Sequence, residues 1–174
     1  MRKRRFGVAL LTLVAPILAA VTFAAVEIEK FHRVEDRVAI GGQPTISQIA
    51  SLAPEGFRTV INLREPSEHD AAAEESAVRD LGMVYVNIPV RTSDPKDGEA
   101  DQFLKVTADA RIYPVFIHCE TANRAAAFWM IRRIVVDRWS REAAEKEARE
   151  IGLKSPSLRD FALDYARRHG SREG

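Results

Sequence analysis

The sequence YPVFIHCETANRAAAFWMIRRIVV occupies residues 113–136 and joins an apolar segment, a short polar loop and a helical pattern. Residues 113–118 are typical of a buried strand, and residues 125–136 place apolar side chains at helical spacing. The loop Cys119–Arg124 therefore connects the end of a strand to the start of a helix. Backbone N–H groups in such a turn bind anions, and the positive end of the helix dipole lies nearby. The pattern predicts an α/β fold with an anion site at a strand's carboxyl end.

The chemistry of this loop rests on its first and last residues. Cys119 is the only cysteine of the 174-residue chain, and the positive potential of the turn favours the nucleophilic thiolate form. The planar guanidinium of Arg124 is suited to a phosphate or sulfate group. The loop has no glycine, so Asn123 is predicted to take the left-handed backbone position. The residues predicted to bind phosphate are Glu120, Thr121, Ala122, Asn123 and Arg124.

The rest of the chain alternates strand and helix signals. Predicted strands occupy residues 37–40, 58–63, 83–88 and 113–118. Helical patterns lie between them, and the chain after Arg124 is helical nearly to its end. Strands that alternate with helices form mainly parallel sheets covered on both faces. We therefore expect a central sheet of about four strands, flanked by helices and followed by a helical C-terminal part.

The N-terminus has the composition of a targeting segment. Residues 1–5 read MRKRR, and residues 6–26 are almost free of charge. This pattern predicts either a signal peptide cleaved after Ala24 or a retained membrane anchor. Both place the remaining chain outside the cytoplasm, in the bacterial periplasm. The predicted organisation is a signal or anchor at 1–24, a linker at 25–33, one domain at 34–169 and a tail at 170–174.

Composition excludes several function classes. Without residues 1–24, the chain has 22 basic and 25 acidic residues, so no basic field indicates a nucleic-acid partner. His32, His69 and His169 are scattered and lack metal-ligand spacing, so we predict neither a metal nor a cofactor. In a protein outside the cytoplasm, a lone cysteine cannot form an internal disulfide, which favours a chemical role for Cys119.

The His-Cys pair with an arginine opening the next helix resembles the phosphate-binding loop of cysteine-dependent protein tyrosine phosphatases. The stretches AIGGQP (39–44), FRTVINLR (57–64), IPV (88–90) and IGLKSP (151–156) are similar to the bacterial beta-lactamase-hydrolase-like branch of that family. The resemblance extends from about Phe31 to Arg168. It implies a cysteine-phosphatase-like fold and hydrolysis of phosphate monoesters through a cysteinyl-phosphate. The implied substrate is a phosphorylated protein or small molecule.

The resemblance also implies roles for residues outside the loop. His118 would orient the loop and tune the thiol. The general acid of these phosphatases is an aspartate on an earlier loop, and Asp94 is the candidate here, with Asp97 as the alternative. Both could equally be turn or N-cap residues.

Arg64 is a candidate second anion contact. It follows a predicted strand and could reach the pocket at the sheet's carboxyl edge. A salt bridge with Glu65 or Glu68 is the other interpretation of this residue.

The loop departs from the phosphatase pattern in its length. Four residues separate Cys119 from Arg124, whereas most tyrosine phosphatases have five, and four is the spacing of rhodanese-type sulfurtransferases. Ala125 also stands where the phosphatases usually have a hydroxyl. Two alternatives therefore stay open. One is a sulfurtransferase carrying a persulfide on Cys119, and the other is a catalytically degenerate anion-binding module.

Overall fold

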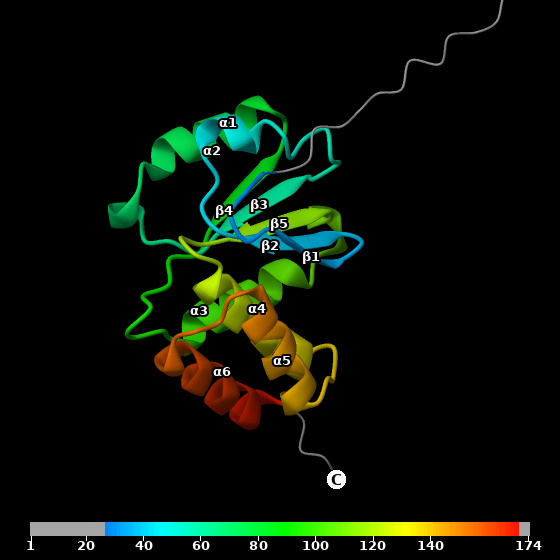
Figure 1. The fold of residues 1–174 in the computed structure, drawn as a ribbon, viewed down its shortest axis with the longest axis vertical. Coiled ribbons are helices and arrows are strands. Elements are labelled where there is room, and N and C mark those ends of the chain that lie inside the picture. The colour runs from blue at the N-terminus through cyan, green and yellow to red at the C-terminus, as the bar shows by residue number, and fades with distance from the viewer. Residues whose placement is uncertain (1–26, 171–174) are drawn as a thin grey trace, which may run out of the picture.

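The computed structural model describes residues 27–170 and contains one five-stranded sheet in the order β1-β2-β5-β3-β4 (Figure 1). The strands are β1 His32–Glu35, β2 Val38–Gly41, β3 Thr59–Asn62, β4 Val84–Asn87 and β5 Val115–His118. The last four are mutually parallel, and only β1 pairs antiparallel, with β2. The carboxyl ends of β2, β5, β3 and β4 therefore meet at one edge of the sheet.

Helices cover both faces of this sheet (Figure 1). They are α1 Ile46–Ile49, α2 Ala71–Asp80, α3 Asp97–Thr107, α4 Asn123–Val135, α5 Arg141–Ile151 and α6 Pro156–His169, with 3₁₀ turns at Pro66–Glu68 and Ala110–Ile112. The helices α1 and α2 lie on one face, and α3 to α6 lie on the other.

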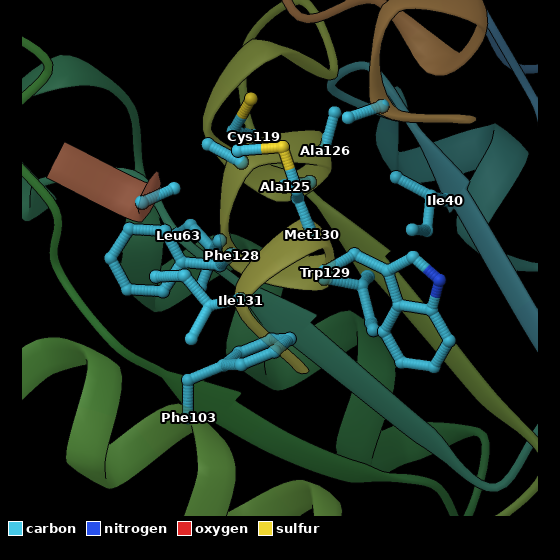
Figure 2. Packing of buried hydrophobic residues seen from close by; sticks show 14 of the residues in the cluster. Ile40, Leu63, Phe103, Cys119, Ala125, Ala126, Phe128, Trp129, Met130 and Ile131 are labelled. Atoms are coloured by element: carbon cyan, nitrogen blue, oxygen red, sulfur yellow. The ribbon is translucent and has the colours of Figure 1, made fainter. Parts of the chain in front are cut away.

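Alternation along the strands divides the core between the two faces. In β5, Val115 and Ile117 belong to the cluster under α4, whereas Phe116 belongs to the cluster under α1 and α2. The helix α4 is buried along most of its length, and Phe128 packs edge-on against Phe103 from α3 (Figure 2). Burial on both faces fixes the position of β5 and hence of the loop that follows it.

The predicted α/β class, the mainly parallel sheet and the helical C-terminal part are confirmed. Strand β1 was not predicted, because its sequence HRVE, in which half-buried and exposed residues alternate, gives only a weak strand signal. Part of the predicted linker at 25–33 is consequently built into the domain, since Ile28 is buried and β1 begins at His32. No helix between residues 27 and 170 is long and apolar enough to span a bilayer. The predicted signal or anchor at 1–24 lies outside the described residues, as does most of the predicted tail.

Candidate active site

The loop after β5 lies at the carboxyl edge of the parallel strands, as the sequence predicts. Strand β5 ends at His118, and α4 begins at Asn123, so Arg124 belongs to the first turn of the helix. Cys119 is 1% exposed and Arg124 is 4% exposed. Figure 2 shows Cys119 beside the start of α4, near Ala125. The nucleophile candidate and the guanidinium are thus fixed by one buried strand and one buried helix.

The left-handed residue of the loop is Ala122, with φ 64° and ψ −6°. The prediction that Asn123 takes this position is wrong. Asn123 begins α4, and its side-chain oxygen accepts hydrogen bonds from the backbone N–H groups of Lys154 at 2.9 Å and Ser155 at 3.2 Å. A non-glycine residue in this region costs on the order of 1–3 kcal/mol and persists only where its surroundings hold it.

The surroundings of Ala122 are tightly packed. Its carbonyl accepts the Ala126 N–H at 2.8 Å, and the Glu120 carbonyl accepts the Gln43 N–H at 3.0 Å. A side chain at Gly152 would lie only 3.4 Å from both the Ala122 methyl and the Thr121 carbonyl oxygen. The loop is therefore held from outside by the segments after β2 and α5.

Glu68 holds the side chain of Arg124 in place. From the sequence, Glu68 was predicted only as a salt-bridge partner of Arg64. Nη1 and Nη2 of Arg124 donate to the two carboxylate oxygens of Glu68 at 2.6 and 2.7 Å. Nη1 also donates to the Val90 carbonyl at 2.9 Å. This pairing uses the outer end of the guanidinium. The edge formed by Nε and Nη2 retains two N–H donors for an anion.

Arg124 and Glu68 each stabilise the charged form of the other. The hydrogen bond from Arg124 lowers the pKa of Glu68 to about 2, against the opposing effect of burial. Burial acts to lower the pKa of Arg124, but the bond to Glu68 and the electrostatic interaction with Cys119 raise it. The pair's contribution to stability is therefore complete above the carboxyl's ordinary pKa of 4.5 and is lost as the pH falls through about 2. Arg124 is a permanently charged group beside the sulfur.

Arg64 forms a salt bridge with Glu68, one of its two predicted roles, with Nε 3.4 Å from a carboxylate oxygen. Its Nη2 donates to the Glu68 carbonyl at 2.6 Å, and its Nη1 donates to the side-chain oxygen of Gln43 at 3.0 Å. The other predicted partner, Glu65, binds Arg91 at 3.0 Å instead. Arg64 thus supports the backbone that carries Glu68.

His118 is fully buried directly before Cys119, and its Nε2 lies 2.7 Å from a carboxylate oxygen of Glu74. Its ring stacks on Phe116 with 5.5 Å between centroids. The predicted role of His118 in orienting the loop stays a prediction. Glu74 was not found by the sequence analysis, although it lies on the helix that follows β3.

Asp94, the predicted general acid, lies on the loop between β4 and α3. Its side chain is 59% exposed and pairs with Lys96. The start of this loop touches the site through the Val90 carbonyl, which Arg124 binds. The alternative, Asp97, begins α3 and binds Arg168 at 2.8 Å, which is a helix-terminus role. The role of Asp94 as general acid stays a prediction. Among the described residues, no contact joins Asp94 to Cys119.

The family described as DSP-PTPase phosphatase fused to NAD+ kinase matches residues 13–161 of this sequence. The chain belongs to this family. Within this DSP-PTPase family assignment, a beta-lactamase hydrolase-like protein of Agrobacterium fabrum is 36% identical over 130 residues. That match covers 71% of this chain and 30% of the relative, so the chain spans less than a third of that relative's length.

Solved structures agree with the DSP-PTPase assignment. A putative phosphatase (DUF442) from Shewanella putrefaciens has a TM-score of 0.72 and 25% identity, over 83% of this chain and 95% of the other. A cysteine-to-serine variant of Pseudomonas aeruginosa TpbA in complex with phosphotyrosine has a TM-score of 0.57 and 21% identity, over 78% of this chain and 91% of the other. The chain therefore shares its family and its fold with phosphatases.

Replacing Glu68 with glutamine should disable Arg124 without removing it. The amide cannot accept two charge-assisted hydrogen bonds, so the guanidinium loses its fixed plane. We expect kcat/KM for an aryl phosphate to fall roughly 10- to 100-fold, the equivalent of about one charged hydrogen bond. Glu65→Gln, which affects a more exposed pair with Arg91, is the matched control and should lose less than twofold. Equal losses in both variants would contradict the inference that Glu68 holds the Arg124 guanidinium in place.

Proposed function

We propose that this chain hydrolyses phosphate monoesters through a cysteinyl-phosphate on Cys119. The observation that carries the proposal is the Arg124–Glu68 pair, because it presents the Nε and Nη2 donors of Arg124 as a fixed fork beside the sulfur. The DSP-PTPase family and the cysteine-phosphatase fold support the same conclusion.

In the proposed reaction, the Cys119 thiolate attacks phosphorus, and the bond to the leaving oxygen breaks. Arg124 and the loop amides of Glu120–Arg124 hold the three equatorial oxygens as charge spreads over them. Asp94 is the proposed proton donor to the leaving oxygen, since its loop begins at the carbonyl that Arg124 binds. A water molecule then attacks phosphorus and gives its proton to the Asp94 carboxylate, and the P–S bond breaks to release inorganic phosphate and the free thiolate.

A sulfurtransferase is the second candidate, because four residues rather than five separate Cys119 from Arg124. A shorter loop encloses a smaller group, such as a persulfide sulfur. In that reaction the thiolate would take a sulfur atom from thiosulfate, release sulfite and pass the sulfur to cyanide. The degenerate anion-binding module remains the interpretation if neither reaction occurs.

Variants of the loop separate these chemistries. Because a bidentate guanidinium binds a phosphoryl group better than a point charge, Arg124→Lys should lose at least about 100-fold in kcat on an aryl phosphate. Cys119→Ser should lose all turnover. Measurement of phosphate release alongside thiocyanate formation from thiosulfate and cyanide checks both reactions. Cys119-dependent thiocyanate without phosphate would establish the sulfurtransferase instead, and neither product under reducing conditions would leave the binding module.

The substrate that we propose is a phosphorylated protein or small molecule, preferably one with a second negative charge. TpbA binds phosphotyrosine in its complex, which supports a phosphorylated side chain. A hollow of about 400 Å³ at the turn between α5 and α6 is lined by Arg149, Lys154 and Arg159. Glu145 pairs with the two arginines, so the lysine charge is not compensated by that carboxylate. The Lys154 backbone is bonded to Asn123 beside Arg124, which connects the hollow to the loop.

The lysine provides a test of this preference. Lys154→Ala should raise KM several-fold for a substrate with two phosphate groups and leave KM for p-nitrophenyl phosphate nearly unchanged. The reason is that an exposed lysine contributes through charge attraction rather than packing. Lys105→Ala, on the remote helix α3, is the control. An equal change in KM for both substrates would remove the second-charge preference.

We also propose that the domain is located outside the cytoplasm, on the basis of the basic and apolar pattern of residues 1–26. Attachment to the membrane through residues 6–26 is one form of this proposal, and cleavage after Ala24 is the other. A reporter enzyme that is active only in the periplasm should be active when joined after Gly174. Deletion of residues 2–24 should abolish that activity, and activity of a cytoplasm-only reporter in the full fusion would refute the location.

A further inference from the structure

A buried carboxylate lies beneath the catalytic loop. Glu74, on α2, is 1% exposed. Four side chains contact its two oxygens, and they come from segments that are far apart in the sequence. They are His118 at 2.7 Å, Gln43 at 2.9 Å, Asn62 at 3.2 Å and His69 at 3.3 Å.

A carboxylate in this position needs a reason beyond packing. Burying an ionised group costs several kcal/mol unless partners compensate for it, and a neutral amide could also hydrogen-bond with Asn62 and Gln43. A carboxylate, however, accepts at both oxygens, whereas the NH2 group of an amide would face a donor on one of its two sides. The only imidazoles that contact Glu74 within residues 27–170 are His118 and His69. His118 is the closer of the two, and it directly precedes Cys119.

A chain of hydrogen bonds also links Glu74 to the Arg124–Glu68 pair. Gln43, which donates to Glu74, accepts a hydrogen bond from Arg64, and Arg64 in turn binds Glu68. The backbone N–H of Gln43 binds the Glu120 carbonyl inside the loop. One carboxylate is therefore connected to the residue before the nucleophile, to the loop and to the segment that orients Arg124.

We propose that Glu74 is a positioning residue for Cys119: its buried carboxylate holds the His118 ring in place at the end of β5, and thereby fixes the backbone that carries the sulfur. The loop N–H groups that favour the thiolate over the thiol follow directly from the strand end that His118 anchors. For catalysis, this inference rests on the proposed function. For the reactivity of the thiol it does not, because that property can be measured without any substrate.

The groups around Glu74 are consistent with an ionised carboxylate. Burial acts to raise the pKa of Glu74, but the hydrogen bond and charge of His118, the bond from Gln43 and the charge of His69 lower it below its usual value. Tyr85 on β4 also faces this cluster through Asn62. Burial, together with the charge of Glu74, raises the pKa of Tyr85 to about 12, so the phenol stays neutral at physiological pH.

The test compares Glu74→Gln with Glu75→Gln in the full chain. Glu75 is the next residue of α2, and it pairs with Arg79 at the surface. The readout is the rate of Cys119 alkylation by iodoacetamide as a function of pH. We expect the midpoint of the profile to move up by about one pH unit in Glu74→Gln and to stay unchanged in Glu75→Gln. A midpoint in Glu74→Gln that is unchanged or lower would overturn the proposal.

A charge-retaining variant separates positioning from packing. Glu74→Asp should keep the midpoint near that of the wild type, even if its melting temperature falls. A shift in Glu74→Asp as large as that in Glu74→Gln would show that packing alone is responsible, which would also overturn the proposal. If Glu74→Gln does not fold, His118→Asn removes the same pair from the other side and should give the same upward shift.

Turnover distinguishes this inference from the proposed function. In an active enzyme, Glu74→Gln should lower kcat on p-nitrophenyl phosphate at pH 6 by about tenfold and leave KM nearly unchanged, since substrate contacts are retained. If the wild type releases no phosphate but the alkylation shift is present, the proposed function fails and the role of Glu74 stands. If the wild type releases phosphate and both glutamine variants behave alike, the role of Glu74 fails and the function stands.

Discussion

The bidentate ion pair between Arg124 and Glu68 is the interaction on which the arrangement of the site depends. The two residues are 56 positions apart, and their contact joins the start of α4 to the 3₁₀ turn after β3. Arg64 and the Val90 carbonyl complete the shell around this pair. A buried guanidinium without these partners would carry an uncompensated desolvation cost. With them, it keeps its charge and presents one edge to an incoming anion.

The two motifs on either side of the loop contain glycines because the backbones approach each other closely there. A side chain at Gly42 would lie 3.0 Å from the Glu120 carbonyl and 3.1 Å from the Glu29 carbonyl. Gly152 lies on the other side of the loop, where a side chain would be 3.4 Å from the Thr121 carbonyl oxygen, and has φ 142°. The stretches AIGGQP and IGLKSP, which carried the family resemblance, are thus the two walls of the loop. Their glycines let the chain pass near enough to hold Ala122 in its strained conformation.

The sequence predicted what local pattern determines and missed what long-range contacts determine. The apolar segment before Cys119 and the helix after it defined the loop, because a buried strand and a buried helix both have strong periodic signals. Asn123 was chosen as the left-handed residue from intrinsic preference. The tertiary structure instead uses its side chain to bind the turn before α6, which leaves the strained position to Ala122. Local pattern did not reveal that Glu68 pairs with Arg124 or that Glu74 contacts His118, because these partners lie far away in the chain.

The carboxylates of Glu68 and Glu74 contact two separate sets of side chains. Glu68 is ion-paired with Arg124 and Arg64, so this trio retains one positive charge beside the loop. Glu74 contacts the histidine ahead of Cys119, on the side of the sheet covered by α2. Positive potential is therefore concentrated at the mouth of the loop, where a phosphoryl group would bind, rather than spread through the interior. That distribution lets the site attract an anion, while the contacts of the two carboxylates hold the segments around a loop built on a strained residue.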